Sequence, residues 1–137
     1  MKPVYIEAAN LARQNREFVL ATVVNTKGPT PQKPGATLLV RADGSTVGTP
    51  GGGCVEGDIW FGAKEALREH TGPLVKDYYL NEDIAARDGL VCGGSMYFYI
   101  GPFEHSAEVS DLSNRIEDAF EGGESLAVAT VVNPKTL

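Results

Sequence analysis

Three consecutive glycines, Gly51, Gly52 and Gly53, lead directly into Cys54 and an amphipathic helical pattern, a combination that few folds accommodate. Apolar residues recur at the spacing of one helix face, at Val55, Ile59, Ala63, Ala66 and Leu67. The pattern predicts a turn into a helix whose first turn holds Cys54. A helix start presents unpaired N–H groups, and glycines let a ligand approach the backbone. The stretch therefore predicts a site for an anion or a thiolate.

The same residues also fit plainer interpretations. Three glycines serve in a tight turn between two elements, and a free cysteine is commonly a small buried side chain. Against that interpretation, a helix start lowers the pKa of a thiol and favours the reactive thiolate. Glu56 and Asp58 suit the first turn because the helix dipole favours acidic groups there. Glu56 is alternatively an acid/base group or an acceptor for a ligand N–H.

Known nucleotide-binding loops are absent around these glycines. No Gly-Lys-Ser/Thr follows them, and they do not form a G-x-G-x-x-G motif after a central strand. The two cysteines of the chain provide neither a disulfide framework nor a complete zinc site. We therefore predict no metal bound by protein ligands alone.

Length and charge restrict the class of protein further. A chain of 137 residues predicts one domain. A net charge of -6 without a Lys/Arg cluster argues against binding to nucleic acid or to an anionic membrane. No apolar run approaches the roughly 20 residues that span a bilayer, and the N-terminus lacks a signal-peptide pattern. The expected location is cytoplasmic.

Helical and strand patterns alternate along the chain. Helices are predicted over residues 4–15, from Cys54 to about residues 71–72, and from Ser110 as N-cap to residues 122–123. Strands are predicted over residues 18–25, 36–41, 46–48, 74–80 and 95–100. Asp43-Gly44 predicts a hairpin turn between the second and third strands. The expected fold is a single mixed α/β (α+β) domain whose sheet of five to six strands packs with helices.

A sequence repeat supplies the sixth strand of this prediction. Residues 17–27 and 124–135 share the sequence ATVVN, and each segment follows a helical pattern with a charged end. Two interpretations remain open, two equivalent strands of one sheet or an old duplication.

Two further segments carry candidate binding residues. The proline-rich loop over residues 26–35 includes Thr30, whose hydroxyl could donate a hydrogen bond to a phosphate. Cys92-Gly93-Gly94 resembles the segment around Cys54, because in both a cysteine stands next to glycines that carry no side chain. Both thiols together would suit a metal or a soft-ligand cofactor if the fold brings them close.

These segments resemble a known family. ATVVNTKGPTPQKPGATLLV, DGSTVGTPGGGCVEGD and LVCGGSMYFYIGP are similar, in order and spacing, to signature segments of the XdhC/CoxI family, accessory proteins of molybdenum hydroxylases such as xanthine dehydrogenase and carbon monoxide dehydrogenase. The resemblance covers about residues 4–102. It implies a chaperone or maturation factor, rather than an enzyme, that binds molybdenum cofactor. It also implies an apo-hydroxylase and a cysteine desulfurase as partners.

The resemblance places the cofactor site on residues of all three segments. These are Gly51, Gly52, Gly53, Cys54, Glu56, Cys92, Gly93, Gly94 and Thr30. Glycine-lined backbone suits the phosphate and pterin of this cofactor, and thiolates suit its metal-sulfur centre.

The sequence departs from the family pattern at three points. Gln32 stands where an arginine is usual in the proline loop, and Pro50 where a β-branched residue is usual. Family members usually continue into a dinucleotide-fold domain, so residues 1–137 are expected to correspond to the N-terminal domain, either as a stand-alone protein, as a subunit whose other half is a separate chain, or as a piece of a longer chain. Two other functions stay open: a thiol-dependent enzyme with Cys54 as nucleophile and Cys92 resolving, or a ligand-free assembly domain that pairs with a separate dinucleotide-fold subunit. We also expect a homodimer.

Overall fold

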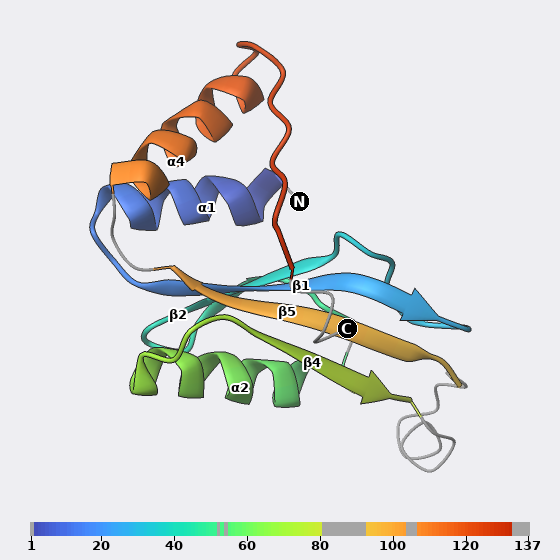
Figure 1. Cartoon of the computed structure of the whole chain (residues 1–137). Helices are drawn as coiled ribbons and strands as arrows, with labels where there is room; N and C mark the ends of the chain where they lie inside the picture. The colour runs from blue at the N-terminus through green and yellow to red at the C-terminus, as the bar shows by residue number, and fades with distance from the viewer. Residues whose placement is uncertain (1, 52, 54, 81–92, 104–106, 133–137) are drawn as a thin grey trace.

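A computed structural model of the chain has helices on both faces of an antiparallel sheet (Figure 1). The structure describes residues 2–51, 53, 55–80, 93–103 and 107–132. Its helices are α1 (Lys2–Arg13), α2 (Glu56–Glu69) and α4 (Ala107–Phe120). Its strands are β1 (Phe18–Lys27), β2 (Thr37–Arg41), β3 (Thr46–Gly48), β4 (Leu74–Tyr79) and β5 (Ser95–Phe103).

The five strands lie in the order β3-β2-β1-β5-β4, and every neighbouring pair is antiparallel. This confirms the predicted mixed α/β fold at the lower end of the expected number of strands. β1 lies at the centre of the sheet because β2 pairs with one of its edges and β5 with the other. Its almost continuous apolar sequence fits that place, since a strand covered on both faces needs apolar residues on both.

One face of the sheet packs against α2. Alternate residues of β1, among them Val19 and Val23, point to this face together with Phe98 and Ile100 of β5. They contact Ile59, which is fully buried on α2. The apolar stripe that the sequence predicts after the glycines is therefore the surface by which α2 packs on the sheet.

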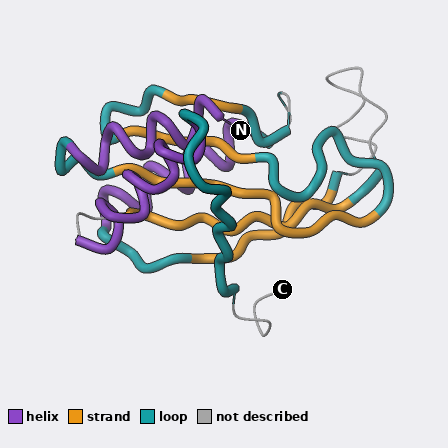
Figure 2. Tube along the Cα trace, turned by 90° about the horizontal axis from the view of Figure 1, so that it is seen from above, coloured by secondary structure: helices purple, strands orange, loops and turns teal. Residues whose placement is uncertain are grey.

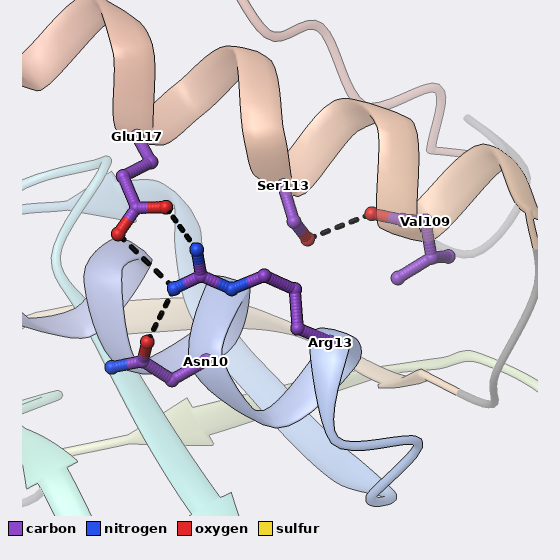
Figure 3. Close-up of polar contacts among 5 residues, drawn as sticks. All are labelled: Asn10, Arg13, Val109, Ser113 and Glu117. Carbon is purple, nitrogen blue, oxygen red and sulfur yellow. Dashed lines mark hydrogen bonds and ion pairs between the residues drawn. The ribbon is translucent and has the colours of Figure 1, made fainter.

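The other face packs against α1, and α4 lies on α1 in a further layer (Figures 1 and 2). Val4, Ala8 and Leu11 of α1 contact Phe18 and Leu39 of the sheet. Arg13 of α1 forms an ion pair with Glu117 of α4 through two hydrogen bonds, and Asn10 accepts a third from the same guanidinium at 2.6 Å (Figure 3). In α4, the Ser113 hydroxyl donates to the carbonyl oxygen of Val109 at 2.7 Å (Figure 3).

The predicted hairpin is present between β2 and β3. Arg41 N–H donates to the carbonyl of Ser45 and Gly44 N–H to the carbonyl of Arg41, both at 2.9 Å. Asp43 accepts hydrogen bonds from the Ser45 hydroxyl at 2.6 Å and from its N–H at 2.9 Å. These bonds lower the pKa of the Asp43 carboxyl below its usual 3.8, because they favour the ionised form.

Removing the Ser45 hydroxyl tests this turn. Ser45→Ala is expected to raise the pKa of Asp43 toward 3.8, since the strongest hydrogen bond to the carboxylate is lost. An NMR titration of the carboxyl carbon measures it. Because the folded pKa is depressed, the stabilisation by this carboxylate is present above the unfolded pKa and lost as the pH falls through the folded value. An unchanged titration midpoint in Ser45→Ala would contradict the assignment.

The structure describes the starts of α2 and α4, and one sequence prediction about a helix start is wrong. α2 begins at Glu56, and the carbonyl of Val55 already accepts the first helical hydrogen bond, from Ile59 N–H at 3.0 Å. Cys54, which the sequence placed in the first turn of this helix, lies outside the described residues. Ser110 lies inside α4 and is not its N-cap, because the helix extends back to Ala107 and Val109 packs against the α1 cluster.

The predicted strand at the C-terminal repeat is also absent. Residues 125–132 have no regular secondary structure, although they repeat the sequence of β1. Both edges of β1 are already paired, so this segment finds no equivalent place in the sheet. It runs instead from α4 toward the sheet past α1, and Val128 lines a cavity of about 270 Å³ with Leu20 and Tyr99 of the sheet (Figure 1).

Candidate functional site

The start of β5 and the proline-rich loop meet in direct backbone contact. A Cβ atom at Gly94 would lie 2.5 Å from the carbonyl oxygen of Pro29 and 2.6 Å from that of Lys27. It would also lie 2.8 Å from the methyl group of Thr30. No side chain fits there, because real Cβ atoms do not approach backbone oxygens so closely. Gly94, the second glycine after Cys92, is thus required for the two segments to touch.

The glycines before α2 reach the same place from the other side. A Cβ atom at Gly51 would lie 2.9 Å from Val55, 3.7 Å from Pro31 of the proline loop and 3.8 Å from Met96 of β5. The structure therefore brings three distant segments together around Thr30, Gly51 and Gly94. We call this place the glycine junction and define it by Thr30, Gly51, Gly53, Gly93 and Gly94.

The glycine junction has a packed side and an open side. Gly51 and Gly94 are buried, whereas Gly53 and Gly93 are exposed, and a Cβ atom at either exposed position would have no neighbour within 4 Å. The packed glycines fix the geometry of the loops. The open ones leave backbone accessible to a ligand.

Two polar side chains near the junction, those of Thr30 and Glu56, have partners within the protein. The Thr30 hydroxyl donates to the carbonyl oxygen of Gln32 at 2.9 Å, so it orders the proline loop. Glu56 accepts a hydrogen bond from the hydroxyl of Thr49, and its side chain lines a cleft of about 320 Å³ beside Trp60. Val55, at the N-cap of α2, makes no side-chain cap hydrogen bond to this helix.

Three predicted site residues, Gly52, Cys54 and Cys92, lie outside the described residues. The sequence alone supports their assignment. Within the described part of the chain, no three His, Cys, Asp or Glu side chains are grouped so that they could hold a metal ion. Every described helix is too short or too polar to traverse a bilayer.

Tyr78 of β4 is a residue with a buried hydroxyl, packed against the core on the α2 face of the sheet, that the sequence did not indicate. It pairs in register with Met96 and packs edge-on against Phe98 at 5.7 Å between ring centroids. Its hydroxyl oxygen is buried and has no hydrogen-bond partner in the described structure. Burial raises the pKa of this hydroxyl above its usual value of 10.0, and the neighbouring Lys76 ammonium opposes that rise without forming a hydrogen bond of normal geometry. Only the β4–β5 register brings Tyr78 beside Met96, so no local motif could have revealed it.

Replacing this hydroxyl by hydrogen is expected to stabilise the free protein. Tyr78→Phe should raise the free energy of unfolding by about 1 kcal/mol, because a buried polar group without a partner is costly. Urea denaturation measures the change. Tyr79→Phe is the matched control, since Tyr79 is 66% exposed and its substitution should leave the midpoint unchanged. A loss of stability in Tyr78→Phe would mean that the hydroxyl has a partner.

The protein is an α+β domain in which the proline-rich loop, the glycines before α2 and the start of β5 meet at the glycine junction. The model of the XdhC and CoxI family matches residues 11–78, and the chain belongs to this family. The matched segment includes the proline loop and the glycines before α2.

Two relatives and one crystal structure are similar to the chain. It is 40% identical over 97 residues to the uncharacterized protein YqeB of Escherichia coli K12, a match that covers 71% of this chain and 18% of YqeB. It is 30% identical over 90 residues to a Bacillus subtilis protein described as a probable xanthine dehydrogenase subunit, covering 65% of this chain and 27% of that protein.

The crystal structure is that of a xanthine dehydrogenase from Bacillus halodurans. It has a TM-score of 0.65 and 25% identity, and the match covers 86% of this chain and 35% of the other. The chain thus spans well under half the length of each of these three proteins.

Proposed function

We propose that this chain binds molybdenum cofactor at the glycine junction and acts as an accessory protein for a molybdenum hydroxylase of the xanthine dehydrogenase type. The observation that carries the proposal is the meeting of three family segments at a point where Gly94 and Gly51 exclude side chains. Family membership and the names of the similar proteins, two of which mention xanthine dehydrogenase, support the class of partner.

The residues at the junction fit this cofactor in kind. Exposed backbone at Gly53 and Gly93 suits a flat pterin and a phosphate, since neither glycine has a side chain to block the approach. The N-cap residue of α2 makes no side-chain cap hydrogen bond, and the start of this helix favours an anion.

Each group would then have a distinct task. Gly53 and Gly93 would admit the ligand, the backbone of α2 would hold its phosphate, and the thiols of Cys54 and Cys92 would lie toward its metal-sulfur part. When bound, the cofactor supplies the molybdenum centre that the hydroxylase uses. The chain itself would protect and deliver it, while a cysteine desulfurase would provide the terminal sulfur.

A steric block tests where the cofactor binds. Gly93→Val adds a side chain on the open side of the junction, where a Cβ atom meets nothing within 4 Å. We expect normal stability but at least about tenfold weaker retention of cofactor released anaerobically from a donor enzyme, a loss of roughly 1.4 kcal/mol. Molybdenum analysis of the recovered protein measures retention, and Cys54→Ala tests the thiol in the same assay.

Gly72→Val is the matched control for this experiment. A Cβ atom at Gly72 also has no neighbour within 4 Å, but this glycine follows the other end of α2. It should retain cofactor as the wild type does. Equal retention by Gly93→Val and Gly72→Val would refute the proposed site, and absence of molybdenum from the wild type would refute the proposed function.

A further inference from the structure

The cleft of about 320 Å³ beside Trp60 lies between the β2–β3 hairpin and the start of α2. Its lining includes Gly44, Thr46 and Gly48 of the hairpin and Glu56, Gly57 and Trp60 of α2. The volume is at the lower end of the range of about 300 to 1,000 Å³ that is typical of sites for small molecules. Because three of these residues are glycines, much of the lining is backbone and leaves room for a flat ring.

Trp60 borders this cleft with an accessible aromatic ring. Its Nε1–H donates to the carbonyl oxygen of Gly44 at 2.7 Å, which holds the indole against the hairpin, and the residue is still 37% exposed. Lys64 lies over the ring at 5.5 Å from its centroid, but this lysine lines a separate pocket with Phe61 and is not part of the cleft lining. The part of the ring that borders the cleft is therefore open to stacking with an aromatic ligand.

Glu56 contributes a carboxylate whose orientation is fixed. It precedes Trp60 by four residues, so the two side chains share one face of α2. Its Oε1 atom accepts the hydrogen bond from the Thr49 hydroxyl, whereas Oε2 has no partner among the described residues. A carboxylate has about four acceptor positions, so both oxygens can still accept hydrogen bonds from a ligand.

Hydrogen bonds connect the cleft with the glycine junction. The Thr49 hydroxyl that donates to Glu56 also accepts a hydrogen bond from the N–H of Gly51 at 3.4 Å. Gly51 belongs to the junction, and Glu56 lines the cleft. The cleft therefore adjoins the junction, and one elongated ligand can occupy both.

We propose that this cleft recognises the 2-amino-4-oxopyrimidine ring that pterins and guanine share, with Trp60 stacking on the ring and Glu56 accepting hydrogen bonds from its ring N–H and its amino group. These two donors are adjacent and parallel, so they match the two oxygens of one carboxylate as a guanidinium does. The inference rests on the proposed function only for the source of the ring. In molybdenum cofactor the ring is the end of the pterin remote from the metal and the phosphate, which would lie at the junction.

Tryptophan fluorescence tests the proposal at the site itself, because Trp60 is the one tryptophan of the chain. Pterin and guanosine, added separately, should each quench its emission, and calorimetry gives their dissociation constants. Tighter binding of pterin would identify the cofactor as the source of the ring, and tighter binding of guanosine a guanine nucleotide. Lumazine carries a carbonyl in place of the amino group of pterin, so it should bind at least about tenfold more weakly than pterin.

Variants of the two side chains separate their contributions. Glu56→Gln should weaken pterin binding at least about tenfold and remove the preference over lumazine, because the amide keeps only one acceptor oxygen. Asp58→Asn is the matched control, since it removes the same charge from the first turn of α2 but Asp58 is not part of the cleft lining. Trp60→Ala should weaken binding at least about fivefold, and Trp60→Phe should restore most of it.

Several results would overturn the proposal. These are equal affinities for pterin and lumazine, equal effects of Glu56→Gln and Asp58→Asn, and no binding of pterin or guanosine at concentrations up to about 1 mM. Tighter binding of N-acetylarginine amide than of pterin would also overturn it, because the cleft would then recognise a protein side chain.

The cleft and the proposed function can fail independently. Molybdenum retention that is unchanged in Glu56→Gln and Trp60→Ala would overturn the cleft assignment and leave the cofactor function standing. A wild-type chain that binds pterin through Glu56 but retains no molybdenum would refute the cofactor function and support the cleft assignment.

Discussion

Gly94→Ala is expected to destabilise the domain by more than about 3 kcal/mol, the range of the most damaging single substitutions. The added methyl group would lie 2.5 Å and 2.6 Å from two backbone carbonyl oxygens, of Pro29 and Lys27. Neither oxygen can move without disrupting the end of β1 or the proline loop, since Lys27 is paired with Ser95 in the sheet. The strain therefore cannot be relieved by rotation of a side chain.

Urea denaturation of Gly94→Ala and Gly93→Ala side by side measures this effect. The two positions are adjacent, but a Cβ atom at Gly93 has no neighbour within 4 Å. Gly93→Ala should change the free energy of unfolding by less than about 0.5 kcal/mol, as exposed substitutions usually do. Similar midpoints for the two variants would show that the proline loop does not press against the start of β5.

Phe98→Ala should lower the free energy of unfolding by about 3 to 5 kcal/mol. Phe98 is fully buried on the α2 face of the sheet, and its ring contacts that of Tyr78. Its removal leaves a cavity beneath the helix whose start adjoins the glycine junction, and neighbouring side chains can fill it only in part. The loss of apolar burial adds to the cost of the cavity.

Phe61→Ala is the control for this prediction. Phe61 lies on α2 and is 57% exposed, so the same change of side chain creates no enclosed cavity. We expect a loss of less than about 1 kcal/mol. Thermal unfolding followed by circular dichroism compares the two variants, and equal losses would mean that α2 does not pack on Phe98.

Cofactor retention in these variants separates stability from binding. Gly94→Ala and Phe98→Ala should lose cofactor because the junction is no longer held together. Gly93→Val should lose it while the protein remains folded. The site at Gly93 is therefore tested by a variant whose effect does not depend on unfolding.

The sequence was sufficient to predict most of the elements and their exposed and buried faces. The hairpin at Asp43-Gly44 and β3 agree with the prediction because turn chemistry and alternation act over a few residues. The stripe from Val55 to Ala66 is buried as predicted because helical period fixes which side chains share a face. The three glycine-containing segments of the candidate site were also found from sequence, since their composition is unusual.

Tertiary structure decided which segments meet and which strand-forming sequence is paired. The contact of Gly94 with the proline loop follows from the β1–β5 register, which joins residues about 70 positions apart in the chain. Tyr78 lies beside Met96 through the β4–β5 register, for the same reason. Residues 125–132 have the sequence of a central strand but are unpaired, because both edges of β1 were already occupied. Local sequence sets what a segment can form, whereas pairing depends on which partners are still available.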